Sequence, residues 1–130
     1  MRLLRFFALF IFSLLFTISS SAQDIQSTIP AAINSANTSA ITKNFGKRVD
    51  ITINDNADNY SNEQGEMILK SFLNKFIFRD FSIVHKGTSG DGSQYIIGSL
   101  KTNSGNFRTY IYIKKSDGNN YIQEIRFESE

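Results

Sequence analysis

The spacing of the apolar residues changes near residue 80, and this change restricts the folds that the chain can adopt. Before it, residues at i, i+3 and i+4 predict one main helix, with the apolar stripe Ile68, Leu69, Phe72, Leu73 and Phe76. After it, apolar and polar residues alternate, which predicts four strands, over 81–86, 95–100, 107–115 and 121–128. Their connections are shorter than the roughly dozen residues that a parallel crossover needs, so the strands should form an antiparallel meander.

The segment before the main helix predicts two shorter helices. Apolar residues at helical spacing predict a helix over 28–36, with Pro30 in its first turn, where the missing N–H costs nothing. A second short helical piece is expected over 39–44. In this piece, Ile41 and the following Phe45 should face inward.

One strand is predicted between these helices and the main helix. Apolar and polar residues alternate over 49–54, which is typical of a half-buried strand. The polar residues 54–60 predict a loop. Ser61 and Gln64 then form a capping box, so the main helix should begin there.

The resulting order is helix, short helix, strand, helix and a meander of four strands, which predicts an α+β fold. A glycine inside a strand often marks a bulge or a bend, and Gly98 lies inside the second meander strand. We therefore expect a curved antiparallel sheet wrapped around the main helix, forming a cone with one open end.

Residues 1–22 have the three parts of a secretory signal peptide. Arg2 and Arg5 precede an apolar run over 6–18, and Ser20 and Ala22 occupy the −3 and −1 positions of a cut before Gln23. The alternative is a membrane anchor, but this run of 13 residues, interrupted by Ser13 and Thr17, is shorter than the roughly 20 that a spanning helix needs. We expect a signal peptide and one exported α+β domain over 23–130, periplasmic or extracellular. N-terminal sequencing of the exported protein should find Gln23, and a chain that starts at Met1 would contradict the prediction.

The charge and the absence of cysteine exclude several classes of function. The chain has 14 basic and 12 acidic residues, and two of the basic ones lie in the signal, so the exported domain is neutral. A neutral surface does not attract nucleic acid or an anionic membrane over long range. With no cysteine and one histidine, neither a lipid-anchored lipoprotein nor a usual zinc site is expected. No cofactor is predicted.

Five short segments resemble a known family: 29–33 (IPAAI), 60–61 (YS), 85–87 (HKG), 95–100 (YIIGSL) and 107–111 (FRTYI). Together they resemble the domain of unknown function 4783 family, which consists of small exported bacterial proteins. The resemblance covers nearly the whole exported domain. It implies a cone of the nuclear-transport-factor-2-like (NTF2-like) or cystatin-like type, with a pocket at the wide end. It implies no activity, because the wider fold includes isomerases, dehydratases and binding modules.

His85 is the only histidine and the strongest candidate for catalysis. Alternation places it on the same face as Phe81 and Ile83, so it should face the core or the pocket. There it could act as a general base, with Asp91 or Tyr95 assisting. The alternative, which we favour, is a hydrogen-bonded histidine near a strand end, because no nucleophile accompanies it.

A row of tyrosines is the strongest candidate for binding. Arg108, Tyr110 and Tyr112 share one face of the third meander strand, and Tyr95 lies on its neighbour. Such rows line clefts and interfaces, including those of homodimers, although aromatic residues also favour strands for other reasons.

Two loops carry weaker signals. Asp55, Asn56 and Asp58 have side chains of the kind that bind calcium, but Tyr60 stands where the calcium loop requires glycine. The glycine-containing segment 87–92 lacks the lysine of a phosphate-binding loop and precedes a strand, so a hairpin turn is expected. No metal site is predicted from either loop.

These features favour a non-catalytic binding module for a small apolar ligand or a protein partner. The alternative is a small enzyme of the isomerase or dehydratase type with His85 as its base. The enclosure of His85 by a pocket would favour the enzyme.

Overall fold

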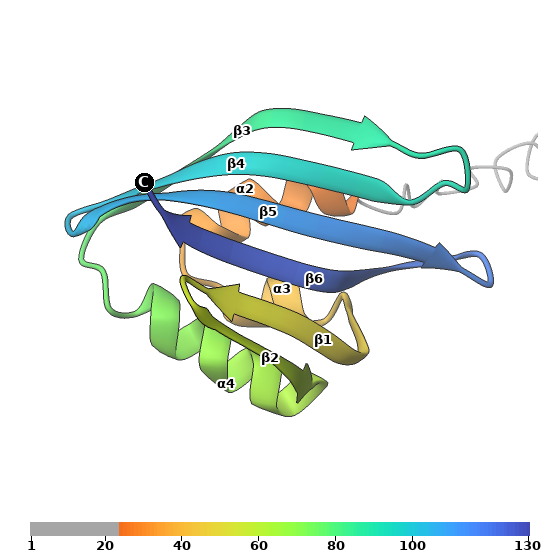
Figure 1. The fold of residues 1–130 in the computed structure, drawn as a ribbon, viewed down its shortest axis with the longest axis horizontal. Helices are drawn as coiled ribbons and strands as arrows, with labels where there is room; N and C mark the ends of the chain where they lie inside the picture. Colours follow the sequence, from red (N-terminus) through yellow and green to blue (C-terminus); the bar gives the residue numbers. More distant parts are fainter. Residues whose placement is uncertain (1–23) are drawn as a thin grey trace, which may run out of the picture.

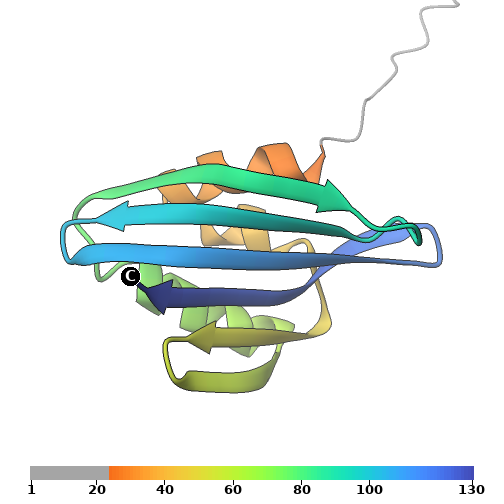
Figure 2. The same ribbon diagram turned by 45° about the horizontal axis from the view of Figure 1, so that its top comes forward.

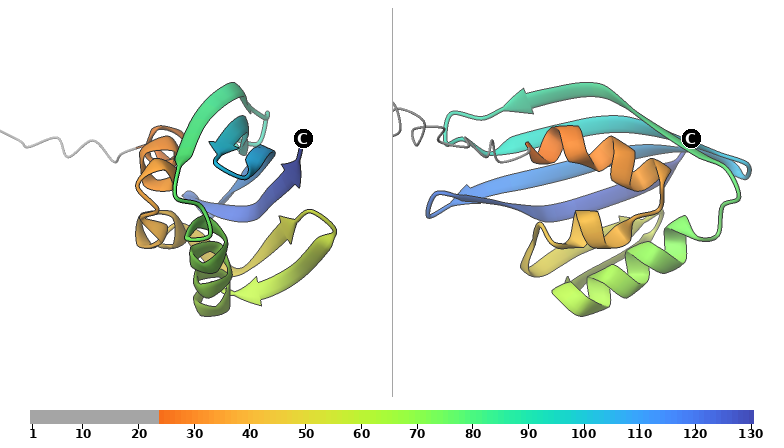
Figure 3. Two further views of the ribbon diagram at one scale, coloured as in Figure 1. Left: turned by 90° about the vertical axis from the view of Figure 1, so that its left-hand side faces the viewer. Right: turned by 180° about the vertical axis from the view of Figure 1, so that it is seen from behind.

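A computed structural model describes residues 24–130, in which one six-stranded sheet carries three helices on one of its faces (Figures 1 and 3). The strand order is β2-β1-β6-β5-β4-β3. This confirms the predicted α+β class. The predicted signal peptide and its cleavage site lie outside the described residues. No helix of the described part is long and apolar enough to cross a membrane.

The predicted meander is confirmed, and each of its strands is longer than expected. Consecutive strands pair antiparallel through tight turns (Figure 2). In the last turn, Asp117 and Gly118 both have positive φ angles, as a two-residue hairpin loop of this sequence favours. The strands are β3 (Arg79–Thr88), β4 (Gln94–Thr102), β5 (Gly105–Ser116) and β6 (Asn119–Ser129).

The main helix, α4 (Asn62–Leu73), begins where the capping box predicts. The Ser61 hydroxyl accepts a hydrogen bond of 3.2 Å from the backbone N–H of Gln64. The Phe72 ring contacts Phe107 and Phe127, with ring centroids 5.3 and 4.6 Å away, so the helix packs on the meander as expected. Phe76 is buried but lies beyond the end of the helix.

The predicted loop over 54–60 is wrong, because most of it forms a strand. β1 (Phe45–Ile53) pairs antiparallel with β2 (Asn56–Ser61) through the two-residue turn at Asn54 and Asp55. β2 is an edge strand that is mostly exposed, so its stability comes from backbone pairing and its sequence carries no apolar alternation. β1 also pairs in parallel with β6, which joins this hairpin to the meander.

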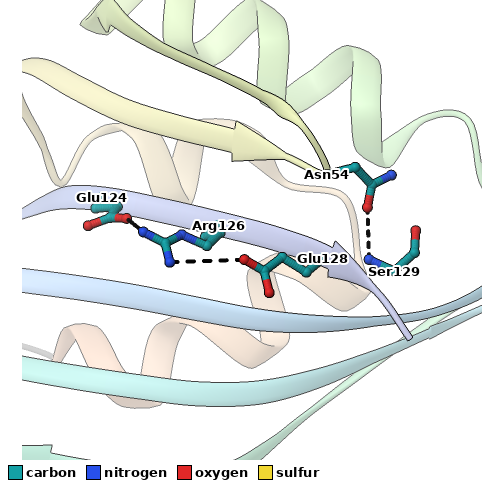
Figure 4. A network of polar contacts seen from close by, with 5 residues as sticks. All are labelled: Asn54, Glu124, Arg126, Glu128 and Ser129. Atoms are coloured by element: carbon teal, nitrogen blue, oxygen red, sulfur yellow. Dashed lines mark hydrogen bonds and ion pairs between the residues drawn. The ribbon is translucent and has the colours of Figure 1, made fainter.

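The turn between β1 and β2 is attached to the end of β6. Asn54 has a positive φ of 54°, which asparagine tolerates better than most residues. Its backbone N–H donates to the carbonyl of Phe127 at 2.7 Å. Its side-chain oxygen accepts from the backbone N–H of Ser129 at 2.8 Å (Figure 4). These bonds hold the hairpin in place.

The first helix, α2 (Ile25–Asn34), starts earlier than predicted, so the position assigned to Pro30 is wrong. Asp24 caps the helix and accepts from the N–H of Gln26, which places Pro30 inside the helix and not in its first turn. Ile25 lies four residues before Ile29, at helical spacing, and packs against the core, so the apolar spacing agrees with the earlier start. The short helical piece is present as α3 (Thr38–Thr42).

Candidate functional site

A β-bulge in β3 decides which way His85 faces. Ile83 pairs with Gly98, but the next pair is His85 with Ile97, so Val84 has no partner in β4. The extra residue reverses the alternation. His85 is therefore exposed on the sheet face opposite the helices, while Phe81 is buried on the helix face. The prediction that His85 shares a face with Phe81 and points toward the core is wrong for this reason.

His85 and Tyr95 form a pair on this outer face. His85 Nε2 lies 2.9 Å from the Tyr95 hydroxyl, and the two ring centroids are 5.5 Å apart. The Tyr95 ring lies across Gly87, where a Cβ atom would be 2.5 Å from the ring. The aromatic ring thus covers a glycine on the neighbouring edge strand, which is a structural role for Tyr95.

Asp91 is engaged in its own turn, apart from His85. Its carboxylate accepts a hydrogen bond of 2.9 Å from the backbone N–H of Ser93. This bond and one to the Ser93 side chain lower the pKa of Asp91 below its usual value. Among the polar contacts of residues 24–130, none joins Asp91 to His85. Asp91 therefore does not orient His85, as a general base at this position would need.

The predicted tyrosine row lies on the outer face of the sheet, away from the helices. Tyr95 pairs with Tyr112, and Tyr110 lies between Ile97 and Arg126. The Arg126 guanidinium is 5.8 Å from the Tyr110 ring centroid and donates to Glu124 at 2.6 Å (Figure 4). Burial, followed by the charge of Glu124, raises the pKa of Tyr110 above its usual value.

Arg108 and Tyr110 meet at a shallow hollow of about 170 Å³ on this face. It is lined by Ile97, Arg108, Tyr110, Arg126 and Glu128. The structure thus groups the predicted residues into two sets. Arg108 and Tyr110 line the hollow, while Tyr95 and Tyr112 pair beside it, with His85 next to Tyr95.

A larger cleft, of about 520 Å³, lies on the helix side of the sheet, between α4 and the β1–β2 hairpin. In β1 and β2, opposite residues share a face, so Ile51 with Asp58, and Ile53 with Asn56, are directed to the same side of the hairpin. In α4 and just beyond it, the lining residues recur at three- and four-residue spacing. The lining residues are Ile51, Ile53, Asp55, Asn56, Ala57, Asp58, Tyr60, Ile68, Ser71, Phe72 and Lys75.

Gly65 explains why the cleft opens beside the second half of α4. A Cβ atom at this position would lie 2.8 Å from Val49 and 3.2 Å from Phe45, so the first half of the helix rests closely on β1. The lining residues of the helix side begin only at Ile68. At its first half α4 contacts β1 closely, because Gly65 has no side chain. At its second half larger side chains, from Ile68 onward, hold the helix away from the hairpin, and the cleft lies there.

The cleft has an apolar floor and a polar rim. Ile51 and Phe72 are buried, and Ile53, Tyr60 and Ile68 are half-buried and pack against the core. The rim holds the exposed residues Asp55, Asn56, Asp58, Ser71 and Lys75. The floor suits the apolar part of a small molecule and the rim its polar groups, and more of the exposed lining is polar than apolar.

The sequence contains the lining residues of this cleft, but their patterns predict other roles for them. Ile68 and Phe72 belong to the apolar stripe and were expected to be core. Asp55 and Asp58 belong to a segment for which the sequence predicts a polar loop. Within residues 24–130, no group of three or more His, Cys, Asp or Glu side chains could hold a metal ion. The sequence does not predict β2, and without this strand it gives no reason to place the hairpin wall of the cleft beside α4.

Comparisons with known proteins agree with this fold. A family model described as "Domain of unknown function (DUF4783)" matches residues 26–128. The crystal structure of a DUF4783 family protein from Bacteroides uniformis is 24% identical, with a TM-score of 0.76, over 82% of this chain and 98% of that one. No curated protein matches the chain.

Two further structures show the wider fold at lower identity. An NTF2-like protein of unknown function from Cytophaga hutchinsonii is 11% identical, with a TM-score of 0.62, over 87% of this chain and 95% of that one. A protein of unknown function with a cystatin-like fold from Nostoc punctiforme is 9% identical, with a TM-score of 0.63, over 82% of this chain and 86% of that one. At these identities the likeness concerns the fold alone.

Proposed function

The chain belongs to the DUF4783 family, a domain of unknown function, and from its cleft we propose that it is a non-catalytic module that binds a small, largely apolar ligand. The cleft between α4 and the β1–β2 hairpin is the observation that carries the proposal. Its volume of about 520 Å³ falls within the range of roughly 300–1,000 Å³ that is typical of small-molecule sites. If the predicted signal peptide operates, this binding takes place outside the cytoplasm.

The position of His85, away from the cleft, supports binding more than catalysis with this residue as base. A general base must come within hydrogen-bond reach of its substrate. The cleft lies on the helix face, whereas His85 is exposed on the outer face and contacts Tyr95. The alternative, an enzyme with His85 as base and Asp91 or Tyr95 assisting, would therefore need a substrate on the outer face, where Asp91 is engaged with Ser93.

Occupation of the cleft can be tested with the neutral fluorescent probe phenylnaphthylamine, whose emission rises in an apolar site. Replacing Ser71, an exposed cleft residue, by Trp should fill the cleft and abolish the rise in emission. Met67→Trp is the matched control, because Met67 is 71% exposed on the same helix and does not line the cleft. Equal emission from both variants and the native protein would contradict the proposal, and so would no emission from the native protein.

A second candidate function is self-association through the outer sheet face. No helix covers this face in the described part of the chain (Figure 3). It combines the half-buried tyrosines with charges of both signs, since Arg108 and Arg126 lie beside Glu124 and Glu128. A second copy related by a two-fold axis would meet a surface that is complementary in charge.

A further inference from the structure

The two walls of the cleft carry opposite charges. On the hairpin wall, the rim holds the carboxylates of Asp55 and Asp58. On the helix wall, it holds the ammonium of Lys75, just beyond the end of α4. The apolar floor lies with them in the same cleft, and the half-buried Ile53, Tyr60 and Ile68 present more of it than the buried Ile51 and Phe72.

These charges do not neutralise one another. The ion pairs of residues 24–130 involve only Arg126 with Glu124 and Glu128, so neither Asp55, Asp58 nor Lys75 has an oppositely charged side chain within 4.0 Å. Asp58 accepts one hydrogen bond, from the backbone N–H of its neighbour Asn59, at 2.7 Å. Each group therefore retains most of its capacity to bind a charged group of a ligand.

We propose that the cleft binds a short apolar peptide with free termini, and this inference rests on the proposed function. The peptide ammonium would lie at Asp55 and Asp58, its carboxylate at Lys75 and its apolar side chains on the floor. Charge-assisted hydrogen bonds of this kind are stronger than neutral ones. Asn56, Ser71 and Tyr60 line the same cleft and could bond the peptide amides.

The orientation of the peptide between the two charged walls can be tested with three forms of one peptide, trileucine. Calorimetry measures the binding of each form to the protein. The forms are the free peptide, the N-acetylated peptide and the C-amidated peptide. The native protein should bind the free form best, and each blocked form about threefold to tenfold more weakly, which is the range for partly exposed and hydrogen-bonded ion pairs.

Variants then assign each terminus to its wall. Lys75→Gln should weaken the free peptide and leave the amidated one unchanged. The double change Asp55→Asn and Asp58→Asn should weaken the free peptide and leave the acetylated one unchanged. Lys70→Gln is the matched control, because Lys70 is exposed in the last turn of α4, does not line the cleft and should change nothing.

The outcomes separate this inference from the proposed function. If all three peptides bind equally, or if the variants do not discriminate between them, the peptide inference is wrong. If in that case phenylnaphthylamine still binds the native protein and fails with Ser71→Trp, the binding function itself stands. If neither peptide nor probe binds, both proposals fail.

Discussion

Gly98 lies where the helix face of the sheet has no room for a side chain. A Cβ atom there would overlap the Phe81 ring and lie 2.9 Å from the carbonyl oxygen of Ser82. The bulge of β3 begins directly opposite, at Ile83. The extra residue, Val84, thus lies in the neighbouring strand β3, opposite Gly98, and not in the strand that contains the glycine, where the sequence predicts a bulge or a bend.

Gly98→Ala should destabilise the domain by about 1–3 kcal/mol, the usual cost of overpacking a core. Chemical denaturation followed by circular dichroism would measure it. Gly90→Ala is the control, because a Cβ atom there has nothing within 4 Å, and its effect should stay within about 0.5 kcal/mol. Equal stability of the two variants would show that Phe81 moves aside without cost.

Strand alternation predicts the face of some candidate residues of the outer face correctly and of others wrongly. Arg108 and Tyr110 share a face as alternation predicts, because β4 and β5 pair without a register shift over these residues. The predicted face of His85 is wrong, because one additional residue, Val84, reverses the direction of every side chain that follows it in β3. A bulge of this kind has no signal in apolar periodicity.

At the scale of elements, α4 connects the core to the cleft. One side of it, at Leu69 and Leu73, is fully buried, and Ile68 and Ser71 face the cleft. The helix ends at Leu73, and the Arg79 side chain donates to the carbonyl oxygens of Leu73 and Phe76 at 3.1 and 2.5 Å. These bonds tie the start of β3 to the segment that follows α4, where the Leu73 carbonyl also accepts from the backbone N–H of Phe76 at 3.4 Å.

Loss of the helix cap should destabilise this element. Ser61→Ala removes the hydroxyl that accepts from the Gln64 N–H and should cost about 0.5–2 kcal/mol of unfolding free energy. Ser71→Ala is the matched control within the same helix. Because alanine is the better helix former, this variant should be unchanged or about 0.5 kcal/mol more stable in thermal unfolding. A Ser61→Ala variant as stable as the native protein would mean that the cap contributes nothing.

β2 matters more than its short, polar sequence indicates. It lies at the edge of the sheet, and its backbone pairs with β1 over six residues. On its outer side, Arg48 donates to the side chain and the carbonyl of Asn59, the latter at 2.9 Å. These contacts hold the hairpin wall of the cleft beside α4, so the proposed ligand site depends on an element that apolar patterning does not reveal.

At the scale of the whole molecule, the two faces of the sheet differ in character. The helix face holds the core and the cleft, and the outer face presents Tyr95, Tyr110 and Tyr112 with mixed charges. An antiparallel sheet can have one solvated face, so exposure alone does not require a partner. The aromatic row and the balanced charges are what favour a second copy.

Self-association should be visible by sedimentation velocity as a shift from monomer to dimer with rising protein concentration. Tyr110→Glu removes the aromatic ring at the centre of the face and places a carboxylate opposite Arg126, where it occupies a charge that the second copy would meet, and it should restore the monomer. Met67→Glu, on the helix side, should leave the dimer intact. A native protein that stays monomeric at all concentrations would contradict the second candidate function.

The sequence by itself determined the α+β class, the main helix with its cap, and the order and turns of the meander. Those features depend on apolar spacing and turn residues, which act between neighbours in the chain. Only the tertiary structure decided the edge strand β2, the face of His85 and the cleft. These depend on backbone pairing, on one unpaired residue at Val84, and on the meeting of α4 with a hairpin. Such contacts are made between segments whose local sequence does not specify them.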